Sequence, residues 1–164
     1  MEIVFYFLTV IATFFFMEFM AWFTHKFIMH GIMWYFHKDH HQHEPGFFEK
    51  NDIFFLIFAI PSWLCIMLGL MNAYYFVVCI GIGIAVYGLF YFLMHDVFIH
   101  QRFKWFRNSN NFYLLALRKA HKIHHKHLGK EHGEVFGMLI VPSKYFKESQ
   151  ISTSKKRQNK VKSS

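Results

Sequence analysis

The sequence predicts an all-α integral membrane protein with about three to four membrane helices, together with histidine-bearing helices on the cytoplasmic side. Three observations indicate this class. Hydrophobic residues make up 54% of the 164 residues. Residues 53–95 contain no Asp, Glu, Lys or Arg, although a membrane-spanning helix needs only about 20 apolar residues. Finally, the 13 histidines outnumber the 10 acidic residues, which is unusual for a soluble domain of this size.

The first expected span covers residues 3–23 and is charge-free except for Glu18. A secretory signal peptide would have a basic segment before its apolar stretch and a cleavage site with small residues. Here Glu2 is the first charged residue and no Ala-x-Ala sequence follows, so a retained membrane helix is favoured.

The charge-free run is long enough for two further spans with a turn between them. Gly and Asn interrupt the run at residues 69–73, which predicts the turn there. Cys65 and Cys79 both fall inside the expected spans, so we expect them to pack as small apolar residues and not to form a disulfide framework. The sequence leaves open whether the short apolar piece at 135–141 also contacts the bilayer.

The distribution of basic residues predicts the orientation in the membrane. All 18 Lys and Arg occur at Lys26 or later and outside the charge-free run, and positive segments stay in the cytoplasm. The N-terminus is therefore expected outside, with the histidine-rich segments and the C-terminus in the cytoplasm. We expect one membrane-embedded domain at residues 1–148 and a basic, disordered tail at 149–164. The Ser/Lys/Gln composition of this tail explains much of the net charge of +8 without a nucleic-acid partner.

A short histidine pattern occurs twice, as HKDHH at 37–41 and as HKIHH at 121–125. On a helix, positions i, i+3 and i+4 lie on one face, so each pattern directs three imidazoles to one side. Each is preceded by a pair of histidines five residues apart, at the cytoplasmic end of an expected span. The order of these motifs predicts two half-sites, each built from one span end and one cytoplasmic helix.

The five-residue spacing turns about 140° on a regular α-helix and would splay the two side chains. Either the helix loosens into a π-like turn, or the second histidine lies beyond the helix end. Gly31, directly after His30, favours a helix end at the first pair. For His100 the sequence leaves both possibilities open.

Ten imidazoles at these spacings indicate a metal site, because imidazole is a common metal ligand. A structural zinc ion is satisfied by four ligands, often including Cys, whereas two five- or six-coordinate iron ions suit ten donors better. Such ions keep positions open for dioxygen, so oxidation chemistry is the leading interpretation. His43, His127 and His132 are left as either surface or additional histidines.

Metal-bound histidines usually donate their other ring N–H to an acceptor, often a carboxylate. The expected acceptors close to the motifs are Asp39, Glu49, Asp52 and Asp96. Glu18 is a further candidate, because an ionisable residue inside a span is costly and is therefore a functional candidate by default. It precedes His25 by about two helical turns, so we expect it to point toward the site or its access path.

Taken together, these motifs resemble the membrane fatty acid hydroxylase superfamily and, within it, the bacterial β-carotene 3-hydroxylases. The resemblance extends over residues 17–142 and is specific in combination, although HX2HH alone is shared with sterol oxidases and desaturases. It is carried by Met17-Glu18, HKFIMHG at 25–31, Trp34 with HKDHH, Glu49 to Asp52, HDVFIHQR at 95–102, and AHKIHH with Phe136-Gly137. The sequence departs from the pattern in its three additional histidines and at Glu134.

The resemblance implies a non-haem di-iron monooxygenase that hydroxylates carbon 3 of the β-ionone rings of β-carotene to give β-cryptoxanthin and zeaxanthin. It implies dioxygen as co-substrate, a reduced ferredoxin-type electron donor, and no catalytic residues beyond the metal ligands. The ligands implied are His25, His30, His37, His40, His41, His95, His100, His121, His124 and His125.

Two alternatives remain at this point. A fatty-acyl or sterol hydroxylase or desaturase would use the same scaffold, because fold and metal do not determine the substrate. A membrane metal transporter would need ionisable residues along its spans, and residues 53–94 offer none. The basic and aromatic segment at 101–117 is suited to the lipid headgroup region and to receiving an acidic electron donor.

Overall fold

The computed structural model describes residues 1–42, 46–103, 105, 109–129, 131 and 134–150. The expectations for His43, for His132 and for the tail from residue 151 onward concern residues outside these ranges. The described residues form helices and connecting segments, with no strand among them. The all-α class predicted from the sequence is confirmed.

Within the described part of the chain, three helical stretches are long and apolar enough to cross a membrane, namely Glu2–Ile32, Lys50–Met71 and Tyr75–Ile99. The first consists of α1 (Glu2–Phe23) followed by the π-helix η1 (Thr24–Ile32). The second consists of the 3-10 turn η2 (Lys50–Asp52) and α3 (Ile53–Met71). The third consists of α4 (Tyr75–Phe92) and the π-helix η3 (Leu93–Ile99). The chain is therefore an integral membrane protein.

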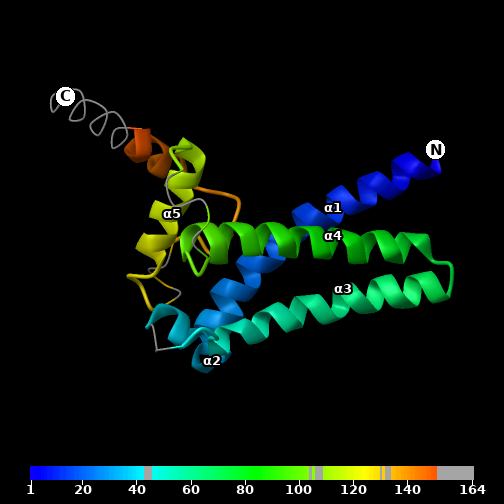
Figure 1. Cartoon of the computed structure of the whole chain (residues 1–164), viewed down its shortest axis with the longest axis horizontal. Helices are drawn as coiled ribbons and strands as arrows, with labels where there is room; N and C mark the ends of the chain where they lie inside the picture. The colour runs from blue at the N-terminus through cyan, green and yellow to red at the C-terminus, as the bar shows by residue number, and fades with distance from the viewer. Residues whose placement is uncertain (43–45, 104, 106–108, 130, 132–133, 151–164) are drawn as a thin grey trace.

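Helices α3 and α4 form an antiparallel hairpin, and α1 crosses α4 obliquely (Figure 1). The turn of the hairpin occupies residues 72–74, where Ala73 adopts a positive φ of 56°. We predicted a turn at 69–73, but Gly69 lies inside α3. A Cβ at Gly69 would lie 2.8 Å from a methyl group of Val78, so this glycine allows close helix packing and does not end the helix.

Two glycines of α4 bring its neighbours close. A Cβ at Gly81 would lie 2.8 Å from the carbonyl oxygen of Ser62 in α3, and one at Gly83 would lie 2.6 Å from Cβ of Thr13 in α1. The Ser62 hydroxyl also donates a 2.8 Å hydrogen bond to the carbonyl of Gly81. Small residues and such interhelical hydrogen bonds are the usual means of packing helices in a membrane.

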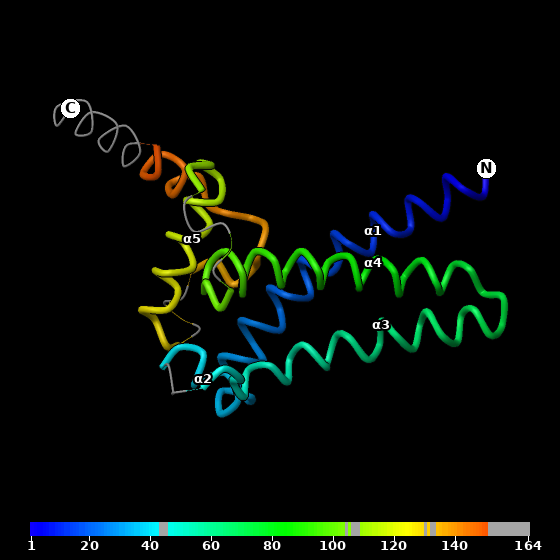
Figure 2. The backbone as a smooth tube through the Cα atoms, in the orientation of Figure 1, coloured from blue at the N-terminus to red at the C-terminus, as the bar shows by residue number. Residues whose placement is uncertain are grey.

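The histidine-bearing helices gather at the end of the bundle that is opposite the N-terminus and the α3–α4 turn (Figure 2). They are α2 (Trp34–His41) and α5 (Phe112–His124), the latter capped by the side chain of Asn111, which accepts from the N–H groups of Tyr113 and Leu114. Both histidine-rich halves of the chain therefore lie at the same end of the membrane helices, as the topology argument requires.

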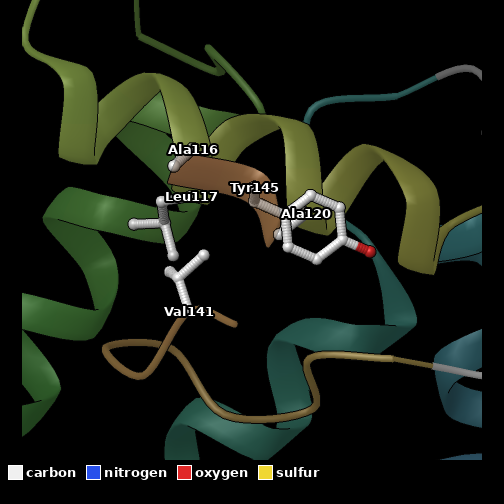
Figure 3. Packing of buried hydrophobic residues seen from close by; sticks show 5 residues of the cluster. All are labelled: Ala116, Leu117, Ala120, Val141 and Tyr145. Atoms are coloured by element: carbon white, nitrogen blue, oxygen red, sulfur yellow. The ribbon is translucent and has the colours of Figure 1, made fainter. Parts of the chain in front are cut away.

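A small hydrophobic core holds α5 in place (Figure 3). Ala116, Leu117 and Ala120 of α5 pack with Val141 and Tyr145 of the C-terminal segment, and the two alanines are fully buried. Residues 117, 120, 121 and 124 share one face of the helix, because they are spaced by three and four. Burial of the apolar part of that face consequently turns the histidines of α5 inward.

Candidate metal centre

All ten histidines singled out in the sequence converge at this end of the bundle. The described residues contain two histidine groups, and within each group the ligand nitrogens all lie within 4.8 Å of one another. The first histidine group comprises His25, His30, His37, His41 and His124, and the second comprises His40, His95, His100 and His121. His125 lies beside the second group, since its Nε2 is 2.8 Å from Nε2 of His121, and its ring stacks on that of His41 at 4.4 Å between centroids.

The grouping differs from the two half-sites that the motif order predicted. His40, from the N-terminal half, joins the C-terminal histidines, and His124, from the C-terminal half, joins the N-terminal ones. In both HX2HH motifs the exchanged residue is the i+3 histidine. Positions i+3 and i+4 diverge by about 100° around a helix, so each of the two helices serves both groups.

The histidine pairs spaced by five are brought together by π-helical turns. His25 and His30 both lie in η1, with ring centroids 5.1 Å apart. His95 lies in η3 and His100 directly follows it, with an i+5 hydrogen bond of 2.9 Å from the His100 N–H to the His95 carbonyl. Gly31 departs from helical dihedrals, with φ −119° and ψ −116°, so the helix is interrupted by a kink directly after His30, where Gly31 indicated a helix end.

Backbone carbonyls orient three of the imidazoles. Nδ1 of His25 lies 2.9 Å from the carbonyl of Phe136, Nδ1 of His30 lies 3.0 Å from that of Leu128, and Nδ1 of His124 lies 3.1 Å from that of Glu134. A carbonyl only accepts, so each Nδ1 carries the proton and donates it outward. The lone pair is then on Nε2 and points into the group, as a metal ligand requires.

Side chains orient three further rings. Nδ1 of His40 lies 2.9 Å from Glu49, and Nδ1 of His95 lies 3.3 Å from Asp96, two of the carboxylates expected as acceptors. Nδ1 of His37 lies 2.7 Å from the amide oxygen of Asn51. Sequence reasoning did not assign Asn51, although its position between two predicted acceptors was a usable signal.

Asp39 and Asp52 have a different environment from the one expected. Asp39 accepts from the backbone N–H of Lys50, and Asp52 accepts from that of Glu49 and from Arg102. Arg102 also donates to Asp96 at 2.8 Å. These contacts stabilise the segment that carries the acceptors of His37 and His40, but no hydrogen bond joins Asp39 or Asp52 to a histidine among the described residues.

Glu18 is buried, and its carboxylate binds a backbone segment near the first histidine group. One oxygen accepts from the N–H groups of Met138, Leu139 and Ile140, at 2.8 to 3.1 Å. The other accepts from the hydroxyl of Tyr87 at 2.7 Å. The expectation that Glu18 points toward the site is thus refined, because it acts on the histidines through the segment that carries the carbonyls of Glu134 and Phe136.

Glu134, which departs from the family pattern, keeps its side chain outside the two histidine groups. Its carboxylate accepts from the Tyr145 hydroxyl at 2.7 Å and forms an ion pair with Lys144, which lowers the pKa of Glu134. Only its carbonyl contacts His124. His127 is exposed and lies in neither group.

Burial favours the neutral form of the histidines in the two HX2HH motifs. Burial, with a smaller contribution from neighbouring histidines, lowers the pKa of His37 to about 3 and that of His125 to about 4. Burial likewise lowers the pKa of His40 and His121 well below the usual value. Neutral imidazole is the form that binds metal.

The inward nitrogens approach one another closely. Nε2 of His40 is 3.1 Å from that of His95, and Nε2 of His100 is 2.9 Å from that of His121. In the first group, Nε2 of His30 lies 3.2 Å from that of His124. Lone pairs facing each other at these distances repel unless a cation lies among them. The donor set therefore fits a pair of nitrogen-ligated transition-metal ions.

The fold and the site define a membrane protein whose described residues include three spans, with helix ends that converge on a histidine-rich centre able to bind metal. A family model described as fatty acid hydroxylase matches residues 10–141, so the chain belongs to the fatty acid hydroxylase family, as the motifs indicated.

Proteins similar to this chain occur in bacteria and plants. The chain is 38% identical to the beta-carotene hydroxylase of Paracoccus sp. (strain PC1), over 83% of this chain and 84% of the relative. It is 41% identical to that of Pantoea ananas, over 83% and 75% of the two chains. It is 34% identical to the chloroplastic beta-carotene hydroxylase 2 of Capsicum annuum, over 77% of this chain and 41% of the relative. No solved structure matches the chain.

Proposed function

We propose that this protein is a membrane monooxygenase that hydroxylates carbon 3 of the β-ionone rings of β-carotene, giving β-cryptoxanthin and then zeaxanthin. The observation that carries the proposal is the convergence of ten imidazoles in two groups where the membrane helices end. Membership of the fatty acid hydroxylase family and 37–41% identity to bacterial proteins named beta-carotene hydroxylases support the substrate class.

The proposed metal is a pair of iron ions, one in each histidine group, with His125 completing the second. Five nitrogens per ion leave a position open for dioxygen, and iron would supply the oxidising chemistry when bound. The chain supplies the orientation of the ligands through the acceptors of their Nδ1 atoms. Residues 1–148 form the proposed catalytic domain.

A substrate as apolar as a carotene is expected to reach the centre sideways from the bilayer, because η1 and η3, which carry His25, His30 and His95, continue directly from α1 and α4. The protein would position the ring C–H bond and exclude water from it. We place the centre and the C-terminus on the cytoplasmic side and the N-terminus outside, following the distribution of Lys and Arg.

A reduced ferredoxin-type protein is the proposed electron donor. Lys122 and Lys126 are exposed beside the second HX2HH motif and suit an acidic partner. Turnover with such a donor is expected to fall steeply as ionic strength rises, because salt screens attraction between exposed charges. Turnover that does not change with salt would remove this part of the proposal.

The deciding experiment is expression in a bacterial host that accumulates β-carotene, followed by chromatography of the pigments. Zeaxanthin is the expected product, and His40→Ala and His124→Ala are expected to abolish it. His127→Ala is the matched control, since this histidine is exposed and belongs to neither group. Unchanged pigments with iron-loaded protein present would overturn the carotenoid assignment and favour an acyl substrate, which the description of the family supports.

A further inference from the structure

The two histidine groups differ in the charge of the groups that accept their Nδ1 protons. In the second group, His40 and His95 donate to the carboxylates of Glu49 and Asp96. In the first group, the acceptors found among the described residues are neutral. They are the carbonyls of Phe136, Leu128 and Glu134 and the side-chain amide of Asn51.

The carboxylates near the second group are incompletely neutralised. Arg102 is shared between Asp52 and Asp96 and also donates to the carbonyl of Phe47. The carboxylate of Glu49 accepts the Nδ1 proton of His40. One guanidinium therefore faces two carboxylates, while Glu49 makes no ion pair with it. Negative charge is consequently concentrated on the side of the second group.

A carboxylate that accepts the Nδ1 proton makes the imidazole a stronger donor and offsets part of the charge of the bound cation. Loss of such an outer partner typically lowers metal affinity about 10- to 100-fold. A carbonyl or amide oxygen is a neutral dipole. It therefore strengthens the imidazole donor less and offsets less of the charge of the bound cation. The two groups thus offer similar nitrogens to a cation in different electrostatic surroundings.

We infer that the two groups bind iron unequally, and that the second group binds its ion more tightly and fills first because Glu49 and Asp96 support its ligands. The inference rests on the proposed function in one respect, because it takes both groups to be iron sites. It adds an order of loading and assigns the cause of that order to particular side chains.

The test is a binding curve for Fe²⁺ on the full-length protein in detergent micelles. Metal-free protein is dialysed without oxygen against graded Fe²⁺, and the bound iron per chain is measured by mass spectrometry. The expected curve has two steps of one ion each. His30→Ala, in the first group, is expected to keep the tight step, and His100→Ala, in the second, to keep the weak one.

Two isosteric variants test the cause. Glu49→Gln keeps an oxygen acceptor for His40 but removes its charge, so the tight step is expected to weaken about 10- to 100-fold while the weak step stays in place. Asn51→Asp places a carboxylate against His37 in the first group, so the weak step is expected to tighten. Asn51→Asp tests the inference by an increase in affinity, which can be measured even if Glu49→Gln fails to fold.

Several outcomes would overturn the inference. One is a single step that binds two ions equally, and another is a Glu49→Gln variant that shifts the weak step or both steps alike. A third is an Asn51→Asp variant that leaves the weak step unchanged. Each of these leaves the proposed function intact, because two ions still bind. Failure of the wild-type protein to bind Fe²⁺ at all would overturn the proposed function as well.

Discussion

Replacing Glu18 with alanine is expected to release residues 138–140 from the membrane helices. In the structure, this carboxylate is the common acceptor for three consecutive backbone N–H groups and for the hydroxyl of Tyr87. The same stretch of chain carries the carbonyl of Phe136, which orients His25. Loss of Glu18 should therefore loosen the first histidine group without removing any ligand.

The magnitude follows from the donors that would lose their partner. The N–H of Met138 and the hydroxyl of Tyr87 make their bonds to Glu18 in fully buried surroundings. A buried donor left unsatisfied costs about 1–3 kcal/mol, so Glu18→Ala should cost about 2–6 kcal/mol. Glu18→Gln keeps a neutral acceptor, and hydrogen bonds to a charged group are about twice as strong, so about 1–3 kcal/mol is expected for it.

Amide hydrogen exchange of the protein in lipid nanodiscs measures this local opening. At about 1.4 kcal/mol per tenfold change, Glu18→Ala should speed exchange at residues 138–140 by about thirtyfold or more, and Glu18→Gln by about fivefold or more. Gly137→Ala should act in the same direction, because its Cβ would lie 2.6 Å from the Glu18 carboxylate. Glu2→Gln, at an exposed position of α1, is the control. Unchanged exchange in Glu18→Ala would refute the reasoning.

Three further predictions concern helix packing, pH and the ion pairs of Arg102. Gly81→Ala should destabilise the α3–α4 hairpin, because its Cβ would lie 2.7–2.9 Å from atoms of α3. Gly88→Ala is the control, because a Cβ there has open space and should be tolerated. Thermal unfolding in micelles compares the two variants. Burial lowers the pKa of His37 to about 3 and of His125 to about 4, so the unfolded chain binds more protons below pH 6.5. The metal-free protein should lose stability as pH falls from about 6.5 to about 4, and a flat unfolding midpoint over that window would contradict this. Arg102→Lys should lower the unfolding midpoint, because lysine cannot reproduce the bidentate contact with Asp52 while also reaching Asp96. An unchanged midpoint would show that these ion pairs contribute nothing measurable to stability.

The sequence by itself was sufficient to predict the membrane spans and to predict which histidines come together. Both depend on local patterns. A charge-free run longer than one span must cross the bilayer more than once, and imidazoles three and four residues apart must share a helix face. The presence of all ten motif histidines at one end of the bundle follows from these patterns together with the number of spans.

Only the tertiary structure decided which histidines share a group. His40 and His124 each join the group formed by the other half of the chain, because the i+3 side chain points away from those at i and i+4. This difference in direction has an effect only because α2 and α5 lie near each other. The carboxylate acceptors Glu49 and Asp96 could be predicted from the sequence, but the backbone acceptors of the other Nδ1 protons could not. Backbone carbonyls such as that of Phe136, more than one hundred residues from His25, have no side-chain signature, so their position depends on the packing that Glu18 secures.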